Sequence, residues 1–287
     1  MEKIQSRVEI EIQDREYKAN NVFYSKTAVI RYFDNEANQI AFDELGFVDQ
    51  IYVQEYIQKY NELQLDYCVI HDFSLDFLKE SNKGEKTILS NFSAKYSIFY
   101  SPGKKIDFSN ILFESEIIDF HKSFFICSQL TYEKSVFFAD MVDFSNVMFK
   151  CDSVNFSKIK FTEAEVSFKN SIFDTGIKDF QGIEYFNGKA VFINVDFGNG
   201  DVLFTDSDFN CEFVSFKVAI FGEGRIDFSR VMFANTETVF EKTNFGDGDI
   251  TFRSADFRSG KVNFTDLFCS SVILIAISGM LIFPLNS

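Results

Sequence analysis

Two glycine-rich segments contain the residue types of a cation site. They are Gly198–Asp201 (Gly-Asn-Gly-Asp) and Gly246–Asp249 (Gly-Asp-Gly-Asp), and carboxylate and carbonyl oxygens are the ligands that Ca²⁺ prefers. Turns of this kind bind calcium where acidic residues recur in successive units of a repeat. The unit between them, Gly222–Arg225, reads Gly-Glu-Gly-Arg, and its arginine disfavours a cation. We therefore expect no metal site and no cofactor.

The two histidines, His71 and His121, do not belong to a recognisable catalytic set. His71 precedes Asp72, and this pair alone is weak support for any chemistry. His121 follows Phe120 at a position that is most often Ser, Thr, Lys or Glu, so we expect it at the surface. We find no Ser-His-Asp set, Cys-His set or phosphate-binding loop in the sequence. The sequence predicts that the protein is not an enzyme.

The bulk composition indicates a folded, acidic protein. Hydrophobic residues make up 46% of the chain and aromatic residues 17%, which excludes a disordered chain. The net charge of −15 argues against direct nucleic-acid binding, which needs a basic surface. The five cysteines form no CxxC pair, and the first residues, MEKIQSRVEIEIQD, lack the apolar stretch of a secretory signal. We expect a cytoplasmic protein, either free or attached to the inner face of the cytoplasmic membrane.

Phenylalanine recurs every twelve residues in two series that are offset by five. Of the 27 positions in these series 25 are Phe, in a chain with 39 Phe among 287 residues, and Tyr132 and Tyr185 fill the other two. A fixed period of this kind is the signature of a solenoid. The first series is Phe108, Phe120, Phe144, Phe156, Phe168, Phe180, Phe192, Phe204, Phe216, Phe228, Phe240, Phe252 and Phe264, and the second is Phe113, Phe125, Phe137, Phe149, Phe161, Phe173, Phe197, Phe209, Phe221, Phe233, Phe245 and Phe257.

Each unit contains two short segments in which an apolar or small residue and a Phe alternate with polar residues, as in a strand with one buried face. Val142–Phe149 (VDFSNVMF) and Ile226–Phe233 (IDFSRVMF) show the pattern. We expect the segments to be joined by one tight corner and one longer corner, and the Phe side chains to point inward. Glycine marks the longer corner, where we expect positive φ, at Gly176, Gly188, Gly200, Gly224, Gly248 and Gly260.

An acidic or amide residue often precedes a Phe of the first series. We expect these side chains to accept hydrogen bonds from backbone amides at the corners, which is the usual role of Asp and Asn in turns. They are Asp107, Asp119, Asp143, Asn155, Asp179, Asp227 and Asn263.

The half-units VDFSN, VNFSK, IDFSR and VNFTD resemble pentapeptide repeats, a family with the pattern A-(D/N)-(L/F)-(S/T)-x. The resemblance covers about residues 104–266. It implies a right-handed quadrilateral β-helix, with one side per pentapeptide and four sides per coil. This chain departs from the family in its 5+7 spacing, which lengthens every second side or corner.

The corner sequences favour a coil of 24 residues, because Gly198–Gly200, Gly222–Gly224 and Gly246–Gly248 are 24 residues apart and the corners between them differ. A flattened coil of 12 residues is the alternative.

Four regions follow from these patterns. Residues 1–90 lack the period and are expected to form a small mixed α/β head or N-terminal cap. Residues 91–103 lead into the solenoid, which extends over 104–266. The last region, 267–287, is an apolar tail.

Within the head, alternation predicts a strand at Arg7–Gln13 and one or two more in Val22–Phe33. Apolar residues at steps of three and four predict a helix between Asn35 and Gln64. Such a region is expected at the end of a solenoid, where the outer coil would otherwise expose its core and its strand edges.

The tail contains 19 residues without a charge, Leu267–Leu285. This length is at the lower limit of a membrane span, about 20 residues. The tail is therefore predicted to be either a membrane anchor or a cap on the last coil. A cap would be amphipathic, whereas this segment is apolar nearly all round, which favours the lipid bilayer.

These features predict a non-catalytic β-solenoid scaffold for protein–protein interaction, held at the membrane if the tail inserts. Its partner would be another protein, and a homodimer is compatible with the sequence. The family resemblance implies one alternative, because some pentapeptide-repeat proteins mimic duplex DNA and bind type II topoisomerases such as gyrase. The other alternative is a membrane-acting effector, or a truncated relative of pentapeptide proteins that are linked to a channel domain.

Overall fold

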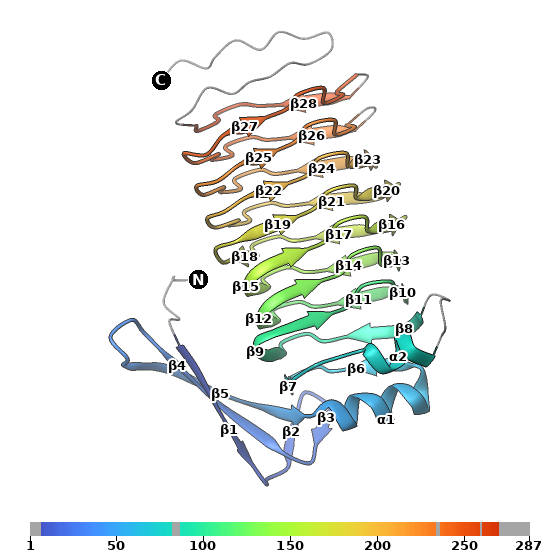
Figure 1. The fold of residues 1–287 in the computed structure, drawn as a ribbon, viewed down its shortest axis with the longest axis vertical. Coiled ribbons are helices and arrows are strands. Elements are labelled where there is room, and N and C mark those ends of the chain that lie inside the picture. The colour runs from blue at the N-terminus through green and yellow to red at the C-terminus, as the bar shows by residue number, and fades with distance from the viewer. Residues whose placement is uncertain (1–6, 82–86, 234–235, 259, 270–287) are drawn as a thin grey trace.

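The chain forms a β-solenoid in the computed structural model, which describes residues 7–81, 87–233, 236–258 and 260–269. The coils stack along one axis, with the N-terminal region at one end and β28 (Lys261–Asn263) at the other (Figure 1). The solenoid has about 9 turns with about 24 residues per turn. The predicted solenoid and the larger coil are therefore confirmed, and the flattened coil is wrong.

Each coil has four sides, and each side is a column of parallel strands whose neighbours are in register. In the first coils a single strand spans both side 1 and side 2; these strands are β9 (Ile98–Asp107), β12 (Phe124–Thr131) and β15 (Met148–Asn155). In later coils the two sides have separate strands. Side 1 continues with β18 (Ile172–Phe173), and side 2 continues with β19 (Ile177–Asp179), β22 (Val202–Leu203), β25 (Ile226–Asp227) and β27 (Ile250–Thr251). Side 3 consists of β10 (Ile111–Glu114), β13 (Val136–Phe138), β16 (Lys160–Thr162), β20 (Glu184–Phe186) and β23 (Asp208–Asn210). Side 4 consists of β11 (Ile117–Asp119), β14 (Met141–Asp143), β17 (Glu165–Ser167), β21 (Lys189–Val191), β24 (Phe213–Ser215), β26 (Glu237–Val239) and β28.

The two Phe series fill the centre of the coils. Rings in neighbouring coils stack face to face, as Phe108 and Tyr132 do with 4.7 Å between centroids and 3° between planes. Rings of the first series within one coil meet edge to face, as Phe108 and Phe120 do at 6.0 Å and 88°. Each aromatic pair contributes about 0.5–1.5 kcal/mol beyond the burial of its area. The ladder therefore fixes the register of successive coils.

The tight corners, between sides 2 and 3 and between sides 4 and 1, contain a residue with positive φ at every twelfth position, from Asn110 (φ 59°) to Asp266 (φ 56°). The sequence pattern did not predict this, because Lys, Arg, Asp and even Val occupy the position. The Asp or Asn three residues earlier closes the turn, and Asp107 Oδ1 accepts from the Ser109 N–H at 2.8 Å. The same bond forms at all seven positions predicted for it, which are Asp107, Asp119, Asp143, Asn155, Asp179, Asp227 and Asn263.

The longer corners bring backbone of neighbouring coils into close contact. Four of the six predicted corner glycines have the expected positive φ, namely Gly176, Gly188, Gly200 and Gly224. The expectation is wrong for Gly248, whose φ is not positive, and the φ of Gly260 depends on residue 259, which lies outside the described residues. At Gly248 a Cβ atom would lie 1.8 Å from the carbonyl oxygen of Gly224, so close approach of the coils, and not φ, requires glycine there.

The N-terminal region covers the first coil. β1 (Arg7–Gln13), β4 (Thr27–Phe33) and β5 (Gln39–Val48) form an antiparallel sheet that joins the solenoid, because β5 pairs in parallel with β7 (Cys68–His71). A hairpin of β2 (Tyr17–Ala19) and β3 (Val22–Tyr24) lies near α1 (Gln50–Tyr60) (Figure 1). This helix buries Val53 and Ile57 in the main core. A short helix, α2 (Asp76–Ser81), follows β7. The strand predicted at Arg7–Gln13 is confirmed.

The predicted helix between Asn35 and Gln64 is only partly correct. It begins at Gln50, and Gln39–Val48 is strand β5 instead. β5 pairs with the whole length of β4, and these backbone hydrogen bonds override the three- and four-residue apolar spacing. The helix starts where Asp49 accepts a hydrogen bond from the Tyr52 N–H at 3.0 Å, as an N-cap does.

The stack of coils begins before the visible repeat. β7 pairs in parallel with β9, and β8 (Thr87–Ser93) pairs in parallel with β6 (Glu62–Gln64), β10 and β11. These strands come from the stretch in which the sequence shows no period. They add turns to the solenoid on the N-terminal side of residue 104.

Only the start of the predicted tail, Leu267–Cys269, lies within the described residues. Phe268 forms a bridge to Asn244 on side 1, while Leu267 and Cys269 pack against the core. These three residues continue the last coil, and the rest of the segment predicted at 267–285 lies outside the described residues. Of the helices that the structure describes, none is long and apolar enough to cross a bilayer.

Candidate functional site

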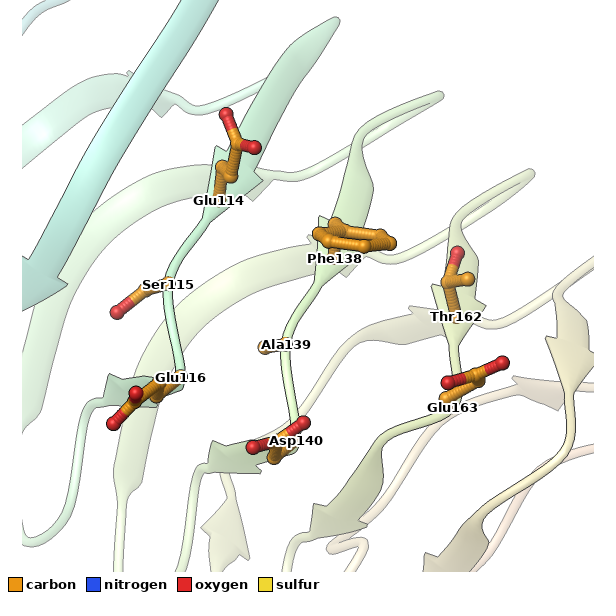
Figure 2. A pocket seen from close by; sticks show the side chains of 8 residues that line it. All are labelled: Glu114, Ser115, Glu116, Phe138, Ala139, Asp140, Thr162 and Glu163. Carbon is orange, nitrogen blue, oxygen red and sulfur yellow. The ribbon is translucent and has the colours of Figure 1, made fainter.

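A groove follows the longer corner between sides 3 and 4 of the first coils. Two adjoining cavities form it, of about 270 Å³ and about 680 Å³, and Ser115 and Glu116 line both. We call it the side groove. The smaller cavity is built by three consecutive coils (Figure 2) and is lined by Glu114, Ser115, Glu116, Phe138, Ala139, Asp140, Thr162 and Glu163.

The pitch of the solenoid arranges these side chains in two rows. Glu114, Phe138 and Thr162 end β10, β13 and β16 and pair in register, so they lie side by side on the outer face (Figure 2). Strands in a column are about 4.8 Å apart, which sets the spacing in the row. The second row lies at the corner itself and consists of Glu116 and Asp140, while Glu163 occupies the position of Ala139 in the next coil (Figure 2).

Phe138 is the main apolar group of the smaller cavity. Its side chain points outward, with 54% of the residue exposed, whereas its neighbour Phe137 is fully buried in the ladder. Phe186 lies two coils further along the same row and is 44% exposed. The outer row therefore alternates aromatic and polar residues.

The carboxylates around Phe138 form no ion pair with any residue that the structure describes. Glu116 lies directly beside Asp140 in the next coil, whose backbone N–H donates to the Glu116 carbonyl oxygen at 3.0 Å. Like charges at directly opposed positions of neighbouring strands destabilise a sheet. The corner row therefore places acid against acid without a compensating cation from the described chain.

Elsewhere in the stack, opposite charges often face each other at the same coil-to-coil spacing. Such pairs are typical of exposed cross-strand positions and contribute a few tenths of a kcal/mol each. They are Lys160 with Glu184 at 2.6 Å, Lys217 with Glu241 at 2.9 Å and Arg230 with Asp206 at 2.6 Å.

The larger cavity extends the acidic surface toward the first coil. Glu62, Asp66 and Asp119 line it, and Lys95 is its one cationic lining residue, 3.3 Å from Asp66. Burial raises the pKa of Asp119, and the nearby carboxylates of Asp143 and Asp66 raise it further. A cation in this cavity would therefore find carboxylates that already repel one another.

The residues singled out by the repeat lie away from the side groove or behind it. The Phe ladder is buried from Phe108 to Phe257, and Phe264 is half-buried in the last coils. Gly176, Gly200, Gly224 and Gly248 stack at the corner between sides 1 and 2. Gly188 and Gly260 belong to the corner between sides 3 and 4, above the groove.

The fold brings a serine, a histidine and an aspartate together at one tight corner. His121 Nδ1 is 2.8 Å from Ser145 Oγ and 3.8 Å from Asp143 Oδ2. In a catalytic triad the serine and the carboxylate contact opposite ring nitrogens, whereas both face the same nitrogen here. These three residues form a polar contact between neighbouring coils and not a proton relay.

The glycine-rich turns use their side-chain oxygens within the protein. Asn199 Oδ1 accepts from the Glu223 N–H at 3.1 Å, and Asp201 Oδ1 accepts from the Arg225 N–H at 2.9 Å. No cluster of three or more His, Cys, Asp or Glu side chains suited to a metal ion occurs in the described ranges. All five cysteines are free thiols, as the lack of CxxC spacing predicts.

The repeat pattern of the sequence does not by itself reveal the side groove. The sequence nevertheless contains the spacing that builds the groove, since Glu116 and Asp140 are separated by one coil of about 24 residues. Aligning the sequence in rows of that length would have placed the two acids side by side. This spacing can be recognised as a pair of neighbouring acids only once the coil length is known.

No protein-family model, curated protein or solved structure matches the chain. The resemblance to pentapeptide repeats therefore depends on the motifs in the sequence, and the function has to be argued from the groove.

Proposed function

We propose that the protein is a non-catalytic solenoid scaffold that binds another protein in the side groove. The observation that carries the proposal is the exposure of Phe138, 54%, at the centre of a cavity lined by polar residues. An exposed apolar group with a polar rim is typical of protein–protein contacts, in which aromatic residues are enriched.

The solenoid suits this function because its side chains are held at fixed intervals. Each strand of side 3 pairs in register with both neighbours, so the rows of the groove have little freedom to rearrange. Ordered surfaces lose less entropy on binding than mobile ones. Repeat proteins use such extended surfaces to bind their partners.

Photo-crosslinking in cells of the source organism tests the proposal on the full-length chain. p-Benzoylphenylalanine replaces Phe138 in one variant and Glu223, at the opposite corner, in the control. We expect an ultraviolet-dependent adduct with one protein, identified by mass spectrometry, at position 138 and not at position 223. The proposal fails if position 138 forms no adduct, or if both positions form the same one.

A further inference from the structure

The side groove combines an excess of negative charge with an exposed aromatic ring. Seven carboxylates and one lysine ammonium group line its two cavities. Four of these carboxylates surround Phe138 in the smaller cavity, where no cationic residue is among the lining residues. A partner that fits the groove must satisfy both its charge and its apolar centre.

The stacked acids of the corner row indicate that the groove favours a positively charged partner. Like charges at neighbouring positions repel each other, and the repulsion is stronger where solvent is excluded. The backbones of Glu116 and Asp140 are held at coil spacing by the hydrogen bond between them, so the two acids stay neighbours in every conformation of their side chains. A cationic group placed over the row would remove this repulsion on binding.

Charge alone does not distinguish the groove from other parts of the solenoid. Glu223 and Asp247 are also exposed acids in neighbouring coils, at the corner between sides 1 and 2. Their row begins with Asn199, glycines flank them, and Arg225 follows closely in the sequence. This pair matches the groove in charge and spacing, but the coils that carry it expose Ile220 and Asn244 beside it on side 1, where the groove exposes Phe138.

From this comparison we infer that the partner contributes a segment with lysine or arginine side chains around one large apolar side chain. The cationic groups contact the corner acids, and the apolar side chain covers Phe138. This inference rests on the proposed function, since it names the chemistry of the protein bound in the same groove. A small polycation or a divalent cation would neutralise the acids but leave the aromatic ring exposed.

A phage-displayed random peptide library, selected on the full-length protein, provides an unbiased test. We expect the enriched peptides to share lysine or arginine residues and one large apolar residue. The affinity of a synthetic enriched peptide, measured by fluorescence anisotropy, should fall about three- to tenfold in E116Q/D140N. It should also fall in F138A, and decrease as the salt concentration rises.

The double variant E223Q/D247N is the matched control, since it removes the same charge at the opposite corner, and we expect it to bind the peptide like the wild type.

Enrichment of neutral or acidic peptides, or of no peptide, would overturn the inference. An equal loss in E116Q/D140N and E223Q/D247N would also overturn it, because binding would then be nonspecific charge attraction. Unchanged affinity in F138A would show that a cation alone is recognised, and would overturn it too. An adduct at position 138 whose crosslinked segment lacks cationic residues would leave the proposed function intact while excluding this partner chemistry.

Discussion

Lys178 donates hydrogen bonds from Nζ to the backbone carbonyl oxygens of Asn199, at 2.5 Å, and of Gly176, at 2.9 Å. It occupies an inward position of side 2, where neighbouring coils have Val154 and Val202, and only 1% of the residue is exposed. Burial lowers the pKa of Lys178 to about 8 from its ordinary value of 10.5, although three nearby carboxylates oppose this shift. The core therefore contains an ammonium group that the carbonyl oxygens of the glycine-rich corner hold in place.

The substitution Lys178→Met should change how stability depends on pH. Below about pH 8 the side chain is protonated in both the folded and the unfolded protein, so it adds no pH dependence. Between about pH 8 and 10.5 the folded protein has released the proton while the unfolded chain still binds it, so the free energy of unfolding of the wild type rises with pH. Relative to K178M, we expect the wild type to gain up to about 3 kcal/mol over this window, measured by urea denaturation at a series of pH values.

K189M provides the control for this experiment, because Lys189 is an exposed lysine on side 4 that pairs with Glu165. Its difference from the wild type should stay nearly constant over the same pH range. If K178M and the wild type keep a constant difference, the folded and the unfolded protein bind the Lys178 proton equally, and folding does not lower its pKa.

Tyr132 interrupts the Phe ladder at an energetic cost. It stacks on Phe108 and Phe156, but its buried hydroxyl has no hydrogen-bond partner among the described residues. Tyr132→Phe removes a polar group that lost its water on folding, so we expect the free energy of unfolding to rise by about 1–2 kcal/mol in thermal or urea denaturation. The reverse change at a comparable stacked position, F144Y, should lower it. A loss of stability in Y132F would show that the hydroxyl has a partner, such as a bound water.

Val218 has a backbone conformation that suits a β-branched residue poorly. Its φ is 58°, in the left-handed region, where the equivalent residues of the three preceding coils are Asn146, Asn170 and Asn194. Asn tolerates this region and Val does not. Val218→Asn should therefore raise the free energy of unfolding by about 1 kcal/mol, and it would place an amide beside Asn194. Val239→Asn, in strand β26, is the control and should not stabilise the protein.

The period of the sequence predicts the coil, because each Phe faces the core at the same point of every turn. The period is not visible before residue 104, although the coils are already present there. One cause is a local insertion in β9: Phe125 pairs with Phe99, but after a register shift Gln129 pairs with Lys105. The preceding coil is also longer than 24 residues, since Val69 pairs with Ile98. The Pro-Gly segment at Pro102–Gly103 absorbs the difference, so the coil is kept while the sequence spacing is lost.

The tight corners and the side groove were unpredictable for a different reason. At the tight corners, the geometry of the turn imposes positive φ on the residue at that position, so Lys158 and Arg230 adopt a conformation that their own preferences do not indicate. At these two corners Asn155 and Asp227 accept a backbone hydrogen bond that closes the turn. The groove depends on contacts between coils. Glu116, Phe138 and Asp140 become a site only when the pitch places them next to one another.

A pair of glycine substitutions can separate close packing of the coils from backbone strain. Gly200 and Gly103 both have positive φ, 100° and 71°. A Cβ atom at Gly200 would lie 2.3 Å from the Gly176 carbonyl oxygen, whereas one at Gly103 would have no atom within 4 Å. Gly103→Ala should therefore cost only the strain of the left-handed region, about 1–2 kcal/mol, and Gly200→Ala should cost clearly more in urea denaturation.

Gly248 extends the same comparison, because its φ is not positive but a Cβ atom there would lie 1.8 Å from the Gly224 carbonyl oxygen. If close packing requires glycine at this corner, Gly248→Ala should also cost more than G103A, without any contribution from φ. If φ is the only requirement, G248A should be nearly neutral and G200A should equal G103A. Where a variant is too unstable to purify, its soluble yield beside that of G103A gives the same ranking. If G200A and G248A both lower the free energy of unfolding more than G103A does, the corner glycines set how closely the coils approach each other.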